Sequence, residues 1–283
     1  ERAADLVRAA VGVPDLAVEI DDVAHWEATS DVAARYQAGR VLLAGDAAHA
    51  LPPNGGYGGN TGIQDAHNLA WKLALAVNGA AGEGLVASYD AERQPIGQLT
   101  IEQAYSRYAR RLTPELLPES APPLVDDLSM EIGHRYHSTA MVPEDEDTAP
   151  VGHPREIAGR PGTRAPHLWL QRDGRTVSSL DLFGRGFVLL AGPEGRGWED
   201  AASAVAKDLD LPLQAHLLQS AGPLADSERR FPAAYGISNA GAVLVRPDGV
   251  VAWRSAGPVE NRADRLATVL TSLLAGMPAA RLT

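Results

Sequence analysis

The chain has 283 residues, enough for one large domain or two of ordinary size, and its 45% hydrophobic and 22% charged content is typical of a soluble globular protein. A net charge of -11 argues against nucleic-acid binding, and no apolar run reaches the roughly 18 residues of a membrane span. The lack of cysteine excludes disulfides, thiolate metal sites and cysteine nucleophiles, and without a signal-peptide pattern we expect a cytoplasmic protein.

The first part of the chain predicts a helix and two strands. Residues 1–12 place apolar side chains on one helical face, and the chain starts as if this helix were already under way. Residues 16–28 alternate as in a strand. Residues 40–47 (RVLLAGDA) form a continuous apolar run before a glycine-rich loop, which is typical of a strand buried on both faces.

Two helices are predicted next. The first, over 61–78, ends at Asn78-Gly79, and its predicted apolar face contains Ile63, Ala66, His67, Ala70, Leu73, Ala74 and Val77. The second runs from Leu85 to Leu112, with a kink expected at Pro95.

From residue 113 to 167 the chain is rich in proline and charge, with one short strand predicted within 131–142. We therefore place a domain boundary near residue 155, which gives units of 1–155 and 156–283. The second unit predicts strands at 167–170, 186–193 and 213–219, helices at 199–209 and 227–236, a hairpin over 240–255 and a last helix from Arg262 to Leu274.

This order of strands and helices resembles a thioredoxin-like domain. Thioredoxin-like redox chemistry uses paired cysteines, and this chain has none. The resemblance therefore implies a structural or oligomer-contact role for residues 156–283, and a homo-oligomer is one alternative. The fold class expected for the whole chain is α/β (α+β).

Three features of residues 41–62 suit a flat ligand with a hydroxylated tail. Gly45-Asp46 brings a carboxylate to the end of a strand, where ligand crevices open in α/β sheets. The glycines at 55, 56, 58 and 59 leave room for a ring, and Pro52-Pro53 stiffens the entry. The amides from Gly59 to Gly62 open a helix whose positive end suits an electron-rich atom.

The stretch GDAAHALPPNGGYGGNTGIQDAHNLAWKLA resembles the second flavin motif of class A FAD-dependent aromatic monooxygenases, the family of para-hydroxybenzoate hydroxylase. Residues 88–98 (SYDAERQPIGQ) and the cysteine-free thioredoxin-like tail fit the polyketide-hydroxylase branch. The resemblance implies that Asp46 binds the ribityl chain of FAD and that Pro52 and Pro53 line the face where oxygen is activated. It further implies that the flavin is contacted by Gly45, Gly58, Gly59, Asn60 and Thr61, and that Tyr57 borders the pocket.

The activity implied by the resemblance is NADPH-driven hydroxylation of an aromatic, polyketide-type substrate through a flavin C4a-hydroperoxide, as in antibiotic biosynthesis. Baeyer-Villiger oxygen insertion starts from the same intermediate and stays open. An alternative from a different class is a truncated homologue without flavin chemistry that acts as a binding, cyclase-like or structural subunit.

The chain departs from the family pattern at one point. The family begins with a GxGxxG turn that binds the ADP pyrophosphate, and no GxGxxG opens this chain. We therefore expect the chain to be the C-terminal half of an enzyme, with the GxGxxG half present as a separate chain or a precursor segment.

Other polar and aromatic residues are interpreted as structural. We expect His49 and His67 to pack or to bond to the backbone, and Arg93 to pair with Glu92 or Asp90. Trp71 is interpreted as a core residue. His134 and His137 have a spacing that faces them apart on a strand, so no metal site is expected.

Overall fold

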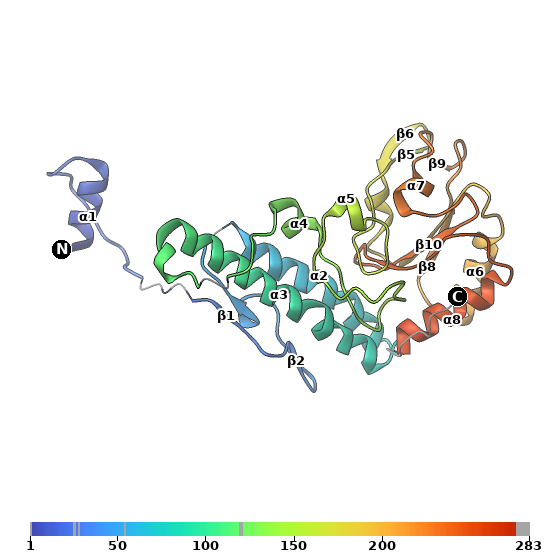
Figure 1. Ribbon diagram of the computed structural model, residues 1–283, viewed down its shortest axis with the longest axis horizontal. Helices are drawn as coiled ribbons and strands as arrows, with labels where there is room; N and C mark the ends of the chain where they lie inside the picture. The colour runs from blue at the N-terminus through green and yellow to red at the C-terminus, as the bar shows by residue number, and fades with distance from the viewer. Residues whose placement is uncertain (1, 25–26, 28, 54, 119–120, 276–283) are drawn as a thin grey trace.

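The computed structural model describes residues 2–24, 27, 29–53, 55–118 and 121–275. Helix α1 (Arg2–Val11) forms where predicted, but it stands apart from the rest of the molecule, and none of its residues is buried (Figure 1). The strand predicted over 16–28 is wrong for its described part, because residues 16–24 and 27 have no regular structure; residues 25, 26 and 28 lie outside the described residues. Alternating apolar residues form a strand only beside a hydrogen-bonding neighbour, and the described residues offer none here.

Two small two-stranded ladders precede the long helices. The first joins β1 (Asp31–Val32) to β4 (His49–Ala50), and the second joins β2 (Gln37–Ala38) to β3 (Val41–Leu42). The buried strand predicted over 40–47 is therefore wrong: β3 is short, Val41 is 63% exposed, and Gly45–Ala47 form the 3-10 helix η1. A strand buried on both faces needs elements packed above and below it, and the exposure of Val41 shows that one face of β3 is left open.

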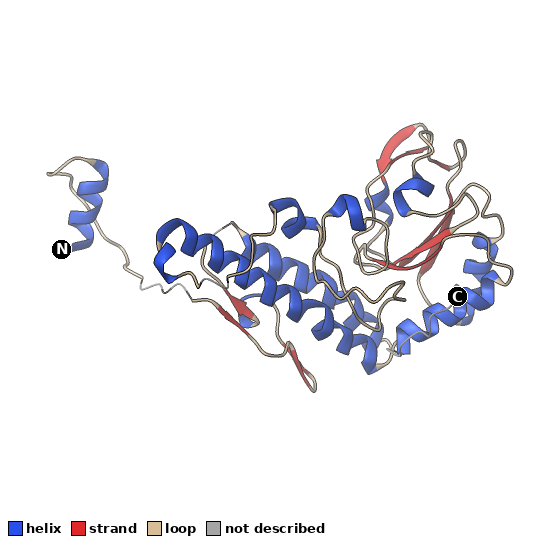
Figure 2. Cartoon of the chain, viewed as in Figure 1, coloured by secondary structure: helices blue, strands red, loops and turns tan. Residues whose placement is uncertain are grey.

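Two long helices lie side by side in the middle of the molecule (Figures 1 and 2). They are α2 (Tyr57–Val77) and α3 (Glu83–Leu112). Helix α2 ends where predicted but begins four residues earlier, after Gly56, whose φ of 70° is left-handed and suits a residue without Cβ. Helix α3 is confirmed and contains Pro95.

The buried face of α2 is not the predicted apolar one. Ile63 and Val77 are 69% and 83% exposed, and their neighbours Ala66, His67, Ala70 and Ala74 are not fully buried either. The buried residues of α2 are Thr61, Asp65, Asn68, Leu69 and Lys72. Polar side chains can be buried when each has a partner, and α3 supplies those partners in the networks described below.

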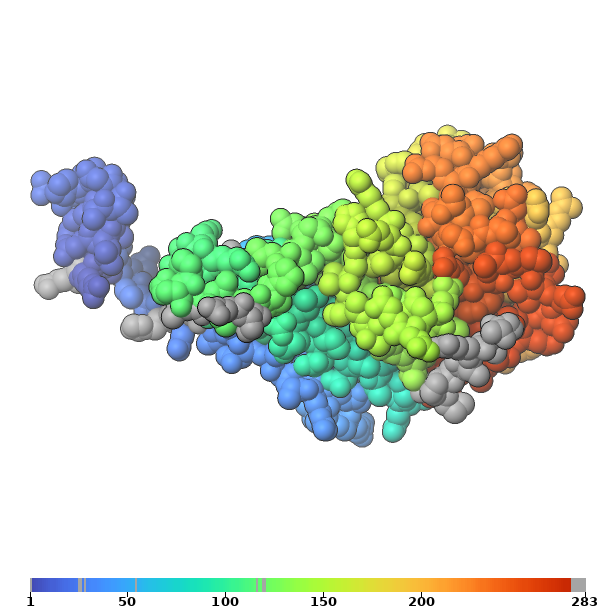
Figure 3. All heavy atoms as spheres, in the orientation of Figure 1, coloured from blue at the N-terminus to red at the C-terminus, as the bar shows by residue number. Residues whose placement is uncertain are grey.

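The segment after α3 contains only short elements, and Figure 3 shows its yellow-green part covering the junction between the helical pair and the C-terminal sheet. The elements are η2 (Pro114–Leu116), α4 (Asp127–Ile132) and α5 (Pro154–Ile157). The strand predicted within 131–142 is wrong, because α4 occupies its start and only isolated bridges follow, from His134 to Val151 and from Arg135 to Thr163. Asp126 caps α4 by accepting a hydrogen bond from the Ser129 amide at 3.0 Å.

A four-stranded sheet of order β11-β10-β7-β8 organises the C-terminal part. β7 and β8 are parallel, whereas β10 is antiparallel to both β7 and β11, which is the arrangement of a thioredoxin-like sheet. The elements in chain order are β7 (Phe187–Ala191), α6 (Trp198–Asp208), β8 (Leu213–Leu217), α7 (Phe231–Tyr235), β10 (Ala242–Val245), β11 (Val251–Ser255) and α8 (Arg262–Ala275). The element order predicted from residue 186 onward is confirmed, although α7 is shorter than expected.

Each face of this sheet has its own core. Phe187, Leu189 and Ala191 of β7 face α6 and α8, whereas Val188 and Leu190 face α7 and a second sheet of order β6-β5-β9. That sheet consists of β5 (Trp169–Arg172), β6 (Arg175–Ser178) and β9 (Leu224–Ala225), followed after β6 by the 3-10 helix η3 (Ser179–Leu182). β5 begins two residues after the predicted strand, and β6 and β9 were not predicted. None of the described helices is long and apolar enough to cross a membrane.

Candidate functional site

A glycine contact joins the two ends of the loop that the sequence singles out. Gly45 opens η1 with a φ of 59°, and a Cβ added to Gly62 would lie 3.1 Å from the Gly45 Cα. The backbone of η1 therefore packs directly on the second turn of α2, and a side chain at Gly62 would crowd this contact. The contact fixes where residue 46 lies relative to the start of α2.

The predicted loop residues differ in exposure. Asp46 is exposed, and its carboxylate has no hydrogen bond or ion pair with any described residue. Pro52 is buried and Pro53 is exposed, so only the second proline is available to a ligand in this structure.

The amides that open α2 are not those predicted. Because the helix begins at Tyr57, its first-turn amides belong to residues 57–60, and those of Thr61 and Gly62 are inside the helix. The amides predicted to open the helix, those of Gly59 to Gly62, are therefore corrected to the amides of residues 57–60, two positions earlier.

The glycines and Asn60 of this turn leave its outer side open. A Cβ added to Gly59 would meet nothing within 4 Å, whereas one on Gly58 would make ordinary contact with Leu51 at 3.6 Å. Asn60 is exposed, and its side-chain amide donates to the Gly56 carbonyl at 2.9 Å. Thr61, in contrast, is only 4% exposed.

Tyr57 is held by two other helices. Its hydroxyl donates to Asp127 of α4 at 3.2 Å, and the Arg107 guanidinium of α3 lies 5.4 Å from the ring centroid. The ring also folds over Gly55, where an added Cβ would come within 2.5 Å of it. Burial, and to a lesser extent Asp127, outweigh Arg107 and raise the pKa of Tyr57. Tyr57 lines a cavity of about 470 Å³ with Asn60 and residues of α4.

Asp65, which the sequence did not single out, lies under the loop with no exposed surface. Its Oδ2 accepts from the Gly45 amide at 3.1 Å and lies 2.8 Å from His49 Nε2. Its Oδ1 accepts from Arg93 Nε at 2.7 Å. Burial raises the pKa of Asp65, but the hydrogen bond from His49 and the charge and hydrogen bond of Arg93 outweigh it and lower the pKa.

His49 and Arg93 therefore have other partners than predicted. His49 is buried as expected, but it bonds to a carboxylate instead of the backbone. Arg93 pairs with Asp65, because its side chain points toward α2 and away from Glu92 and Asp90. It also donates to the Thr61 carbonyl at 3.2 Å and to the Tyr136 hydroxyl at 3.0 Å.

A second buried network joins the helices to the C-terminal sheet. Glu92 of α3 accepts from Lys72 of α2 at 2.8 Å and from both terminal nitrogens of Arg246, which follows β10, at 2.7 and 2.9 Å. Asp248 pairs with the same arginine. The side chains of Glu92, Lys72 and Arg246 are 0% exposed. Burial raises the pKa of Glu92, but the charges of Arg246 and Lys72 outweigh it and lower the pKa well below its usual range.

The sequence contains no local signal for this polar face. Positions 65, 68 and 72 share one side of a helix, but charged and polar residues on one helix face usually indicate a solvent-exposed face. Trp71 is confirmed as a packing residue, with its ring edge-on to Phe187 at 5.7 Å between centroids.

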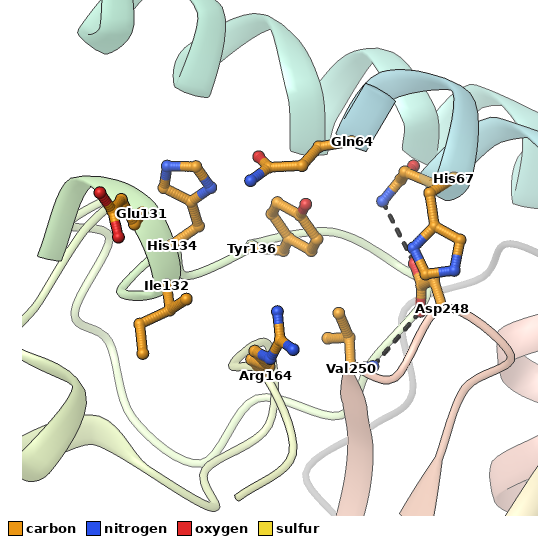
Figure 4. A pocket seen from close by; sticks show the side chains of 10 residues that line it. Gln64, His67, Glu131, Ile132, His134, Tyr136, Arg164, Asp248 and Val250 are labelled. Atoms are coloured by element: carbon orange, nitrogen blue, oxygen red, sulfur yellow. Dashed lines mark hydrogen bonds between the residues drawn. The ribbon is translucent and has the colours of Figure 1, made fainter. Parts of the chain in front are cut away.

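A polar pocket lies where α2, α4 and the β10–β11 turn meet (Figure 4). Gln64 and His67 line it from α2, His134 from the segment after α4, and Arg164 and Asp248 from the C-terminal side. The prediction that His67 packs is wrong, because the face of α2 that carries it is exposed.

His134 and His137 make separate contacts. Burial, followed by the charge of Arg93, lowers the pKa of His134 to about 3, and its Nε2 has no partner among the described residues. His137 Nε2 lies 3.0 Å from the Ala149 carbonyl oxygen. No group of three or more histidine or acidic side chains in the described residues is arranged to hold a metal ion.

The exposed parts of the loop fit one portion of FAD. The carboxylate of Asp46 is free to accept from hydroxyl groups, and the first-turn amides of α2 lie beside the open surface of Gly59. These features suit the ribityl chain and the polar edge of the ring. Within the described residues, no glycine-rich helix start of the GxGxxG type is present for the pyrophosphate.

Comparison with known families shows that the loop lies in a segment matching an FAD binding domain. Residues 1–104 match the FAD binding domain family, and residues 158–277 match the aromatic-ring hydroxylase C-terminal family. The chain is 58% identical over 278 residues to a 4-methyl-5-nitrocatechol 5-monooxygenase of a Burkholderia species, covering 97% of this chain and 51% of that protein. It is 43% identical over 279 residues to a tetracenomycin A2 monooxygenase-dioxygenase of Streptomyces glaucescens, covering 97% and 48%.

Solved structures agree with these matches. A ternary complex of aklavinone-11 hydroxylase with FAD and aklavinone superposes with a TM-score of 0.89 at 40% identity, over 96% of this chain and 50% of that one. A complex of the flavin-dependent monooxygenase PieE with FAD and substrate gives a TM-score of 0.79 at 32% identity, over 97% and 54%. The chain thus spans about half the length of the relatives it matches. It belongs to the class A FAD-dependent aromatic hydroxylase family.

Proposed function

We propose that this chain forms the ribityl- and ring-binding part of an FAD-dependent monooxygenase that hydroxylates an aromatic, polyketide-type substrate with NADPH and dioxygen. The observation that carries the proposal is the accessible, unpaired carboxylate of Asp46, held beside the open first turn of α2 by the contact between Gly45 and Gly62. A solved structure of one relative, aklavinone-11 hydroxylase, contains FAD and aklavinone, which supports the proposed substrate class.

The chain's own residues have binding and shielding roles in this proposal. When bound, FAD carries electrons from NADPH and activates dioxygen. Asp46 would accept hydrogen bonds from the hydroxylated chain of the cofactor, and the first-turn amides of α2 would hold the electron-rich edge of its ring. Pro53 presents an apolar surface at the loop, and Tyr57 closes the side toward α4. The backbone of Gly58, Gly59, Asn60 and Thr61 would hold the ring.

The two predicted units have different roles. We assign residues 1–155 to the flavin-binding part and residues 156–283 to a thioredoxin-like domain that docks on it. The docking rests on the buried pairing of Glu92 with Arg246, which joins α3 to the end of β10. Because thioredoxin-like redox chemistry uses paired cysteines and this chain has none, we assign the second unit a structural or oligomer-contact role.

A further segment is proposed to complete the flavin site. The exposed apolar stripe of α2, which includes Ile63, Ala70 and Val77, is a surface that needs a partner. We propose that the GxGxxG-bearing region of the family packs on this stripe and binds the ADP portion, either as a separate chain or as part of the same polypeptide. Mass spectrometry of the intact native protein distinguishes these arrangements.

Asp46→Ala tests the proposed function. In the enzyme assembled with its GxGxxG region, the loss of this carboxylate should weaken FAD binding by about 1–3 kcal/mol, because a charge-assisted hydrogen bond is removed. FAD affinity is measured by flavin fluorescence quenching, and substrate-stimulated NADPH oxidation is followed in parallel.

Asp208→Ala is the matched control, since Asp208 is an exposed aspartate at the end of α6 in the other unit. It should leave FAD affinity unchanged. A colourless assembled protein that takes up no FAD would contradict the proposal and favour a binding or structural subunit without flavin chemistry.

A further inference from the structure

Asp65 is a buried group that contacts both the backbone of the η1 turn and the arginine that holds the start of α2. Its two oxygens receive three contacts, from the Gly45 amide, from His49 Nε2 and from Arg93 Nε. All of the side chains involved are fully buried. A carboxylate without exposed surface must be fully hydrogen-bonded to be tolerated, and these contacts meet that need.

Through Arg93 the same carboxylate reaches the other end of the loop. Arg93 donates from Nε to Asp65 and from a terminal nitrogen to the Thr61 carbonyl, which belongs to the second turn of α2. Gly45 immediately precedes Asp46, and Thr61 immediately follows Asn60. Asp65 is thus linked to residues next to both the proposed ribityl contact and the proposed ring contact.

We infer that Asp65 is a positioning residue for residues 41–62, here called the flavin loop. It sets the geometry of this loop by holding the η1 turn and the start of α2 in one fixed relation. The inference rests on the proposed function, because the loop has a ligand to align only if the enzyme binds FAD. Asp65 is buried beneath the loop and does not itself touch the cofactor.

The contacts make Asp65→Asn a sharp perturbation. An asparagine has nearly the same shape but replaces one acceptor oxygen by an NH₂ donor. If the NH₂ faces Gly45, two donors oppose each other at the η1 turn; if the amide flips, the NH₂ opposes Arg93 instead. His49 can change tautomer to accommodate the change, whereas the Gly45 amide cannot. Either orientation therefore breaks one of the two links.

The experiment uses the assembled, flavin-binding enzyme and compares Asp65→Asn with Asp248→Asn. Asp248 is also an aspartate paired with a buried arginine, but it lies in the β10–β11 turn and has no hydrogen bond or ion pair with the described residues of the flavin loop. Three quantities are measured at a temperature where all proteins are folded. They are FAD affinity, the absorption spectrum of bound flavin, and hydrogen exchange of the Gly45 amide.

For Asp65→Asn we expect FAD affinity to fall at least about tenfold, the scale of one lost charge-assisted hydrogen bond. We also expect an altered spectrum of the remaining bound flavin and faster exchange of the Gly45 amide or of the amides at the start of α2. Asp248→Asn should leave all three quantities at their wild-type values even if it lowers the melting temperature.

The outcomes separate this inference from the proposed function. A wild-type enzyme that binds no FAD overturns both. A wild-type enzyme that binds FAD, together with an Asp65→Asn variant of unchanged affinity and spectrum, overturns only the positioning role. Equal losses in Asp65→Asn and Asp248→Asn also overturn it, because the effect would then follow from general destabilisation.

Discussion

Glu92→Gln removes the central charge of the network between α3 and the C-terminal sheet. The wild-type cluster is electrically balanced, because Lys72 and Arg246 face Glu92 and Asp248. The substitution leaves two buried cations with one carboxylate. It also weakens the bidentate pairing at 2.7 and 2.9 Å and the contact with Lys72 at 2.8 Å.

The magnitude follows from burial. Removing one partner of a buried ion pair leaves an uncompensated charge and typically costs about 3–5 kcal/mol. The side chains of Glu92, Lys72 and Arg246 are all 0% exposed, so solvent cannot screen the excess charge. We therefore expect a destabilisation of about 3–5 kcal/mol for Glu92→Gln. Combining it with Lys72→Met restores neutrality and should cost clearly less than the sum of the two single substitutions.

Urea unfolding followed by tryptophan fluorescence measures these free energies. Glu115→Gln is the control, because Glu115 is exposed in η2 and its replacement should stay within about 0.5 kcal/mol of wild type. A loss below about 1 kcal/mol for Glu92→Gln would refute the buried network. Strictly additive effects of the two substitutions would refute the charge-balance argument.

Two further predictions concern the buried Gly97 and the partly buried His134. Gly97→Ala should destabilise the fold by about 1–3 kcal/mol through overpacking, because its Cβ would lie 1.9 Å from the hydroxyl oxygen of Tyr36. Adding Tyr36→Phe should recover part of this loss, because it removes a buried hydroxyl that has no described partner. Thermal unfolding measures both effects. The pKa of His134 is about 3 in the folded protein against 6.5 for an unperturbed histidine. As the pH falls, the unfolded chain therefore binds a proton at this residue before the folded protein does. The contribution of His134 to stability is lost as the pH falls below 6.5. Between pH 7 and pH 5 this loss is at most about 2 kcal/mol, and a His134→Gln variant should lack it; equal pH dependence in both proteins would contradict the prediction.

The C-terminal sheet was predictable because its strands carry their own signal. β7 lies in a continuous apolar run, and β10 and β11 flank the turn at residues 247–249. These strands are buried on both faces, so hydrophobicity alone indicates them. β6 and β9 lack that signal, because β6 is polar and β9 has only two residues.

The orientation of α2 could not be read from hydrophobicity. Its apolar stripe is exposed, and its buried stripe contains Asp65, Asn68 and Lys72. Burial of these residues depends on Glu92 and Arg93 of the next helix and on a C-terminal arginine still farther along the chain. A local pattern contains no information about such distant partners. The glycine-rich motif, in contrast, indicates locally which groups the loop offers to a ligand.

The sequential pair Glu92-Arg93 gives α3 a double role that follows from helix geometry. Consecutive residues on an α-helix point about 100° apart, so neighbouring side chains reach different partners. Glu92 points to Lys72 and Arg246, and Arg93 points to Asp65. One turn of α3 therefore anchors both the C-terminal sheet and the flavin loop. A displacement of that turn would disturb both.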